Sequence, residues 1–321
     1  MSKSLNKFLT IILPLGLGVF IIWYIYISFT PEQLAETKGH FNSANYGFVA
    51  LSVFLNLLSH FSRSYRWNFM LEPLRYYPKL ANNFMAISIG YLINIFIPKS
   101  GEISRGMILD KYEDVPFEKG FGTIISERVI DLIFLLGIAS IALLLKFDVL
   151  AEYISESIPK STIYVTIAGI AGLGTVTLLF LKFSKSKINI KLRTFVLGLR
   201  EGVFSILKMK KKGAFLFHTC LIWGLYLLSF YTALFALAET TTISFGTIIT
   251  AFAVGSFTFA FTNSGFGTYP AALAGILSVF GVSKTVGVAF GWIVWTSNIA
   301  SIVFFGCLSL LILPIYNRSK T

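Results

Sequence analysis

The chain has 321 residues, of which 55% are hydrophobic and 13% charged, and its mean hydropathy is +0.75. This composition excludes a water-soluble globular domain and indicates an integral membrane protein. The net charge of +12 would suggest nucleic-acid binding in a soluble chain. In a membrane protein it is expected of loops facing an anionic cytoplasmic leaflet, so we expect no nucleic-acid partner.

Six apolar runs that can cross a bilayer follow one another along the chain. They cover roughly residues 8–29, 46–61, 121–145, 163–183, 214–238 and 286–313, and the second continues amphipathically to residue 70. The first run has no small-residue cleavage site, so we expect it to remain as a start-transfer anchor.

Two further apolar regions, residues 84–97 and 245–280, are too short or too interrupted to cross. Proline and glycine inside an apolar run free backbone groups that lipid cannot satisfy. Such breaks persist only where they are buried in protein or face a wet cavity. The pattern therefore predicts two re-entrant helical hairpins.

The loops predict the orientation. Residues 182–213 carry ten Lys and Arg against one Glu, which marks a cytoplasmic loop. The loops around residues 32–38 and 146–160 are slightly acidic and are expected outside. We expect an all-α protein of the cell membrane, with six transmembrane helices and two oppositely oriented re-entrant hairpins. Both termini are expected in the cytoplasm.

An internal repeat is predicted within this single membrane domain of residues 1–321. Residues 46–145 and 214–313 each read as helix, hairpin, helix, and Gly90 and Gly255 stand equally far before Pro98 and Asn263. Three crossings separate the copies, so their topologies are expected to be opposite. Inverted repeats with discontinuous helices are the recurring architecture of secondary transporters.

Three charges lie inside the third expected crossing: Glu127, Arg128 and Asp131. Each charge near the bilayer centre costs about 3 kcal/mol. The three side chains could neutralise one another, because Arg128 and Asp131 are three residues apart on one helical face. They could instead line a wet cavity or bind a charged ligand. Pairing of Arg128 with one carboxylate leaves one negative charge over, which makes Glu127 and Asp131 proton-coupling candidates.

The first break is expected to form an anion site. Gly101 would permit the turn and Ser100 would cap the following half-helix, whose free N–H groups attract anions. Lys99 and Arg105 would add positive charge for a phosphate head group. Glu102 would offset an arginine or carry a coupling proton. An ordinary polar turn at the membrane surface is the alternative interpretation.

Two other regions leave two interpretations open. The second break is rich in small and polar residues that could present backbone donors to a ligand or permit close packing; they are Asn263, Ser264, Gly265 and Gly267. Arg63, Arg66 and Trp67 end the second helix. They could anchor it at the interface or guide a lipid phosphate toward the first hairpin.

Together these residues resemble one family. Asn94 and its neighbours, Pro98 with Gly101 and Glu102, and the Glu-Arg-x-x-Asp element of Glu127, Arg128 and Asp131 are similar to the lysylphosphatidylglycerol synthase transmembrane-region, or flippase-like, family of bacterial and archaeal membrane proteins. In that family the second repeat usually has a Pro-Gly-Gly-x-Gly run followed by Glu. This chain has Asn263 to Gly267 and no Glu there, which sets the second break apart.

The resemblance implies the lipid-moving half of the family, without the soluble aminoacyl-transferase domain. We expect a flippase or transporter for an anionic, phosphate-bearing lipid, not an enzyme, with no catalytic residues, cofactor or metal. The alternative is an accessory subunit or membrane enzyme acting on aminoacyl-phosphatidylglycerol or a polyprenyl-phosphate sugar. It would have a glycosyltransferase or aminoacyl-transferase partner, and Glu127 would be its general base. A receptor or scaffold is a third possibility.

Overall fold

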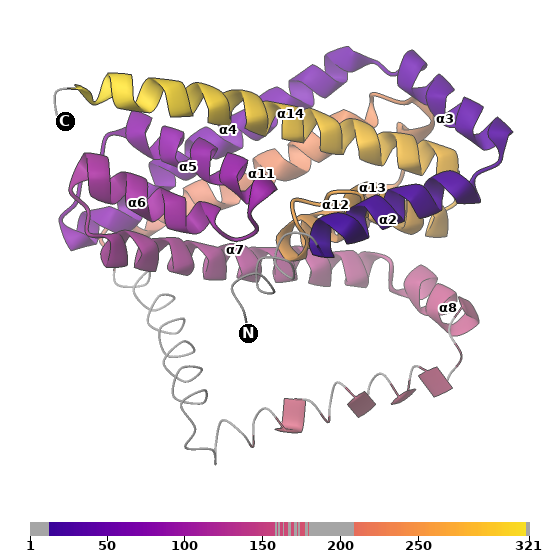
Figure 1. Ribbon diagram of the computed structural model, residues 1–321. Helices are drawn as coiled ribbons and strands as arrows, with labels where there is room; N and C mark the ends of the chain where they lie inside the picture. Colours follow the sequence, from indigo (N-terminus) through magenta and orange to yellow (C-terminus); the bar gives the residue numbers. More distant parts are fainter. Residues whose placement is uncertain are drawn as a thin grey trace.

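The computed structural model describes residues 13–157, scattered positions between 159 and 179, and residues 209–318. Within these residues all regular secondary structure is helical, which confirms the all-α prediction (Figure 1). The expected crossing at 163–183, most of the basic loop 182–213 and both chain ends lie outside the fully described ranges.

Three described helices are long and apolar enough to cross a membrane: α7 (Phe117–Leu145), α11 (Lys212–Leu234) and α14 (Lys284–Tyr316). A fourth candidate is a bent pair, in which α3 (Pro31–Ser43) meets α4 (Tyr46–Leu71) and its following turn at 72°. The chain is therefore a multi-pass membrane protein. The six crossings expected from the sequence are matched by three or four candidates in the described residues.

The remaining described helices complete the bundle. They are α2 (Leu13–Ser28), the 3-10 turns η2 (Glu72–Leu74) and η3 (Ala238–Thr240), α8 (Phe147–Ser157), and two helical pairs: α5 (Leu80–Phe96) with α6 (Gly101–Glu113), and α12 (Phe245–Phe261) with α13 (Thr268–Val279). In each pair, the loop between the two helices lies where the sequence predicted a break.

The geometry of the first break differs from the prediction at two residues. The left-handed residue of the turn is Lys99, with φ 62°, and not Gly101. A Cβ on Gly101 would collide with the carbonyl oxygen of Gly90 and with the side chain of Asn94. Gly101 is therefore required for the close approach of α6 to α5, whereas the left-handed residue of the turn lies two residues earlier.

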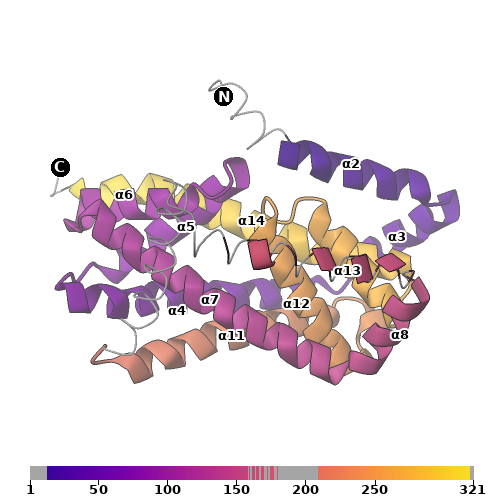
Figure 2. The same cartoon turned by 90° about the horizontal axis from the view of Figure 1, so that it is seen from below.

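The described helices repeat in order. The series α4, α5, α6, α7 corresponds to α11, α12, α13, α14, and α5 and α12 each have 17 residues. Helix α7 packs against α6 and α12, while α14 packs against α13 and α5 (Figure 2). Helices α4 and α11 lie side by side and antiparallel, because Ser52 contacts Ser229 and Arg66 contacts Thr219. The inverted repeat itself stays a prediction.

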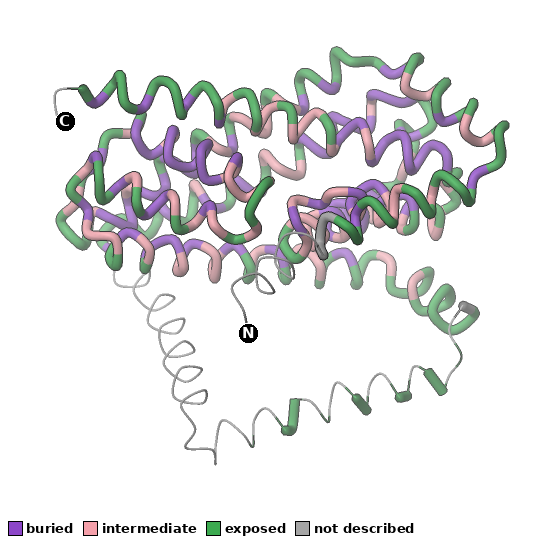
Figure 3. The backbone as a smooth tube through the Cα atoms, viewed as in Figure 1, coloured by how far each residue is buried: buried purple, intermediate pink, exposed green. Residues whose placement is uncertain are grey.

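Buried residues lie where the helices face one another, and exposed residues lie on their outer faces (Figure 3). One core cluster surrounds Leu273 and Phe290, and another surrounds Trp67, all three fully buried. Many outward side chains are large and apolar, such as Leu144 at 79% exposure. Lipid solvates such faces, so packing and polar contacts between the helices hold the bundle together.

Candidate functional site

A buried network of arginines and carboxylates joins α4, α6 and α7. Glu127 of α7 is fully buried. It accepts a close hydrogen bond from Arg63 of α4, and its Oε2 accepts from Arg105 Nη2 of α6 at 3.0 Å. Arg66 Nη2 lies 3.5 Å from its Oε1. Three cationic side chains thus surround one carboxylate, as a buried charge requires.

Asp131 lies one helical turn further along α7 and binds the same two arginines of α4. Its Oδ2 accepts from Arg63 Nη1 at 2.6 Å, and its Oδ1 accepts from Arg66 Nη2 at 3.1 Å. Arg66 also donates to the Thr219 hydroxyl of α11 at 3.1 Å. Arg63 and Arg66 are 3% and 0% exposed, so they do not form the expected interfacial anchor. Two carboxylates on the facing helix make their burial possible.

Trp67 is also buried, and it supports the network. The Arg105 guanidinium lies 4.3 Å from the centroid of the Trp67 ring, and Trp67 Nε1 donates to the Thr123 hydroxyl at 2.9 Å. Stacking on an indole face stabilises a desolvated guanidinium. Trp67 is therefore not part of an interfacial anchor, which was one of its two interpretations, and its N–H finds a partner on α7 inside the bundle.

The charge balance is opposite in sign to the expectation. In the described residues the ion pairs of this region join four arginines to three carboxylates: Arg63, Arg66, Arg105 and Arg128 to Glu102, Glu127 and Asp131. The balance is one positive charge, because α4 and α6 contribute three arginines that the sequence of α7 does not reveal.

Arg128 is held more loosely than the other arginines. Its nitrogens lie 3.5 Å from Glu102, 3.5 Å from Glu127 and 3.6 Å from Asp131. Its side chain is 37% exposed. A guanidinium with long contacts and access to solvent can change partners at low cost. Arg128 is therefore the arginine of this network best placed to bind an incoming anion.

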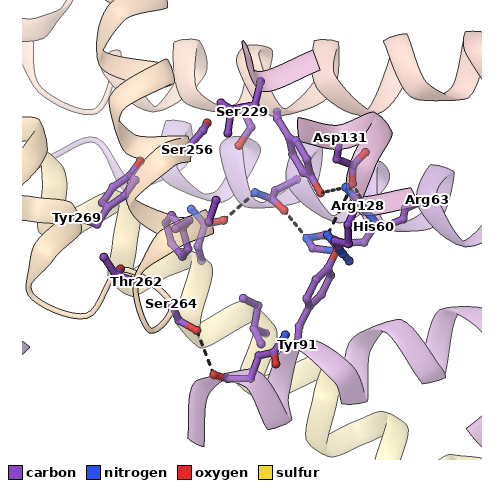
Figure 4. Close-up of a pocket in the computed structure, with 18 of the residues that line it drawn as sticks. His60, Arg63, Tyr91, Arg128, Asp131, Ser229, Ser256, Thr262, Ser264 and Tyr269 are labelled. Carbon is purple, nitrogen blue, oxygen red and sulfur yellow. Dashed lines mark hydrogen bonds and ion pairs between the residues drawn. The ribbon is translucent and has the colours of Figure 1, made fainter. Parts of the chain in front are cut away.

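A cavity of about 390 Å³ lies beside Arg128, between the two breaks (Figure 4). At one end its wall is charged and polar, with His60, Arg63, Arg128 and Asp131 close together in the view. Elsewhere the wall is largely aromatic, formed by Trp223, Phe230, Phe252, Phe259 and Tyr269. A cavity with these two kinds of wall suits a ligand with a charged and an apolar part.

The two break loops contact each other at the edge of this cavity. Lys99 Nζ donates to the Ala260 carbonyl at 2.7 Å, so the ammonium group caps the C-terminal end of α12. Asn263 Nδ2 donates to the Ile95 carbonyl at 3.3 Å, and Ser264 Oγ donates to the Asn94 carbonyl at 3.5 Å. The two breaks, far apart in sequence, thus form one wall.

The N-terminus of α6, where the sequence predicted an anion site, is bound by polar side chains of the protein itself. Asn94 Oδ1 accepts from the Gly101 N–H at 2.7 Å, whereas the Ser100 hydroxyl donates to the Ile97 carbonyl at 2.5 Å. Ser100 is therefore not the predicted side-chain cap, because Asn94 takes that role. Glu102 lies in the first turn of α6, where a negative charge is favourable.

The predicted residues divide into three sets. Eight line the cavity: Arg63, Asn94, Lys99, Glu102, Arg128, Asp131, Asn263 and Ser264. Three belong to the network without lining the cavity: Arg66, Arg105 and Glu127. Four belong to the breaks without lining it: Ser100, Gly101, Gly265 and Gly267. Both break glycines of the second loop have positive φ, and a Cβ on Gly267 would collide with Gly18 of α2.

Several residues of the cavity wall were not predicted from the sequence, among them Asn56, His60, Trp223 and Tyr226. A signal for two of them was present. Asn56, His60 and Arg63 are spaced i, i+4 and i+7, which places them on one face of α4. A polar stripe on an otherwise apolar helix indicates a buried polar environment. Among the described residues, no group of three or more His, Cys, Asp or Glu side chains could hold a metal.

Comparisons with known proteins identify the family. The family model described as "Lysylphosphatidylglycerol synthase TM region" matches residues 11–306. The UPF0104 membrane protein MJ1595 of Methanocaldococcus jannaschii is 33% identical over 92 residues, which are 28% of this chain and 27% of that protein. The match thus spans about a quarter of the relative's length. No solved structure matches the chain.

Proposed function

Because the chain belongs to the lysylphosphatidylglycerol synthase transmembrane-region family, which has a lipid-related role in the membrane, we propose that it is a lipid flippase or transporter. Its cargo is an anionic, phosphate-bearing lipid that moves between leaflets without chemical change. The name of the family concerns its transmembrane region, and the synthase activity in that name is not part of this proposal.

The observation that carries the proposal is the cavity beside Arg128. Its charged end offers a guanidinium whose present contacts are 3.5 Å or longer. A phosphate there would make shorter, charge-assisted hydrogen bonds and would displace Glu102. Its aromatic wall would receive the first part of an acyl or polyprenyl chain. One cavity would thus bind both the phosphate and the beginning of the apolar chain.

The arrangement of the breaks supports movement across the membrane. The α5–α6 and α12–α13 pairs meet at their loops beside the cavity. In our proposal they are re-entrant hairpins that enter the membrane from opposite sides. The protein lies in the cell membrane with six crossings, and both of its termini are in the cytoplasm. Separation of the hairpin loops from one side or the other would open the cavity alternately to each leaflet.

The test is lipid retention by the purified protein in native mass spectrometry. Wild type is expected to retain one class of anionic lipid, and Arg128→Ala is expected to lose it. Lys119→Ala is the matched control, because Lys119 is an exposed cation on the same helix and does not line the cavity. Equal and nonselective lipid in wild type and Arg128→Ala would contradict the proposal.

A second candidate function is favoured by the two carboxylates on the cavity wall, Glu102 and Asp131. Carboxylates beside a bound phosphate could act as general bases. The protein would then be an accessory subunit or membrane enzyme that acts on an aminoacyl or glycosyl lipid with a transferase partner. Formation of a modified lipid that stops in Asp131→Asn, with lipid retention preserved, would favour this candidate over the flippase.

A further inference from the structure

His60 is a titratable side chain of the cavity wall to which the proposed function assigns no role. It lies on α4, one turn before Arg63, and faces the charged end of the cavity (Figure 4). Its ring packs edge-on against Tyr91 of α5, with 4.8 Å between the ring centroids. Its Nε2 lies 2.5 Å from Asn56 Oδ1. The side chain is therefore fixed in position by α4 and α5.

A chain of amides determines which nitrogen of His60 carries the hydrogen. Asn298 Nδ2 donates to the Val294 carbonyl at 2.8 Å, which leaves Asn298 Oδ1 as the acceptor for Asn56 Nδ2 at 2.9 Å. Asn56 must then present its amide oxygen to His60. Because an amide oxygen only accepts, His60 Nε2 carries the hydrogen and Nδ1 carries the lone pair. Nδ1 has no hydrogen-bond partner among the described residues.

The charges that face His60 decide when Nδ1 can accept a proton. The charged and titratable groups that share the cavity wall with His60 come from six helices and one break: Arg63 on α4, Tyr91 on α5, Lys99 in the first break, Glu102 on α6, Arg128 and Asp131 on α7, Tyr226 on α11 and Tyr269 on α13. Arg63 lies one turn away, and the wider network already has one positive charge in excess. In the empty cavity a second cation beside Arg63 is unfavourable.

A phosphate group changes this balance, since its negative charge near Arg128 offsets a new positive charge on His60. We propose that His60 Nδ1 takes up one proton when the phosphate of the ligand enters the cavity, so that anion and proton bind together. The proton comes from the bulk buffer, through solvent that enters the cavity, and binds the Nδ1 lone pair. The Nε2 hydrogen stays on His60 and remains hydrogen-bonded to Asn56 Oδ1. A phosphodiester and one proton together have no net charge, which removes the electrostatic cost of moving the ligand through the membrane.

This inference rests on the proposed function, because it requires an anion in the cavity. It assigns the proton to His60 and not to the carboxylates. Glu127 does not line the cavity, and Arg63, Arg66 and Arg105 surround it. Glu102 does line the cavity and is the competing candidate, so the experiment includes it as a control.

The probe is dihexanoyl phosphatidylglycerol, a short-chain lipid whose phosphodiester does not titrate near neutral pH. Its binding to the wild-type protein in detergent is measured by calorimetry across the pH range around neutrality, in two buffers with different ionisation enthalpies. We expect uptake of up to one proton per bound lipid. We also expect a dissociation constant that rises by up to about tenfold per pH unit, the limit for one linked proton.

His60→Gln retains an N–H donor for Asn56 but cannot titrate. In this variant we expect no proton uptake and a dissociation constant that does not change with pH. Glu102→Gln is expected to keep the proton uptake and the pH dependence. Loss of the pH dependence in Glu102→Gln, with retention in His60→Gln, would overturn the assignment. The wild-type proton count does not depend on the folding of any variant, and a count of zero would overturn the inference by itself.

The outcomes separate this inference from the proposed function. Lipid binding that requires Arg128 but takes up no proton would overturn the inference and leave the lipid site intact. A lack of binding at every pH would overturn both. The deacylated head group, glycerophosphoglycerol, distinguishes a lipid from a soluble phosphodiester. Equal affinity for both probes would assign the site to a soluble ligand, and the proton count would test His60 in the same way.

Discussion

Removal of the charge of Glu127 tests whether the buried network holds the bundle together. Glu127 is fully buried and contacts Arg63, Arg66 and Arg105, which come from two other helices. Glu127→Gln keeps the shape of the side chain. Of the carboxylates in the described residues, it leaves Arg63 and Arg66 paired with Asp131 and leaves Arg105 with none. We expect a loss of about 3–5 kcal/mol, the range for removing one partner of a buried ion pair.

Arg128→Ala provides the comparison within the same network. Its ion pairs are 3.5–3.6 Å long and its side chain is 37% exposed. A partly exposed pair of this kind contributes about 0–1 kcal/mol. The two variants therefore remove charges from adjacent positions on one helix but should differ by at least about 2 kcal/mol.

The assay is reversible unfolding in mixed micelles, in which the fraction of folded protein is followed as the denaturing detergent increases. Thermal loss of the monodisperse species provides an independent ranking of the variants. The reasoning is refuted if Glu127→Gln is as stable as the wild type. It is also refuted if Arg128→Ala loses as much stability as Glu127→Gln, because the network would then not distinguish a buried carboxylate from a loosely held arginine.

Two further predictions concern the first break. Gly101→Ala should destabilise the protein by about 1–3 kcal/mol, because its Cβ would collide with the Gly90 carbonyl; Gly137→Ala on α7, with no atom within 4 Å, is the control and should be neutral or slightly stabilising. Equal unfolding midpoints for the two alanine variants would contradict this. Lys99→Met should loosen the contact between the break loops by removing the 2.7 Å hydrogen bond to Ala260. In a Cys220→Ala, Cys307→Ala background, a Ser256→Cys probe on the cavity wall should then react severalfold faster with a water-soluble thiol reagent, whereas an unchanged rate would show that Lys99 does not hold the loops together.

Much of the fold follows from the sequence, since lipid imposes strict rules on an apolar chain. An apolar run has to form a helix, because the bilayer offers no partner for backbone N–H and C=O groups. The helices α4, α7, α11 and α14 and the breaks after Phe96 and Phe261 could be predicted for this reason. The charges of α7 likewise marked the candidate site, because a charge within an apolar helix must have a partner or a wet surface.

The partners of those charges were decided only by the tertiary structure. Arg63 and Arg66 follow an apolar run, where a sequence pattern favours an interfacial anchor, yet they lie buried against Glu127 and Asp131. Arg105 reaches Glu127 from α6. An ion pair depends on distance in space, and residues separated by an entire hairpin have no local pattern that fixes this distance.

The cavity was also decided by packing, because its wall combines two breaks and several helices that are remote in sequence. Contacts such as Lys99 with Ala260 and Asn263 with Ile95 exist only because the α5–α6 and α12–α13 pairs meet at their loops. By itself the sequence determined the helices, the breaks and the need for charge compensation, all of which follow from local composition and the properties of lipid. The pairing of the charges, and the histidine that lies beside them, required the packing of the whole bundle, because side chains from separate helices meet only there.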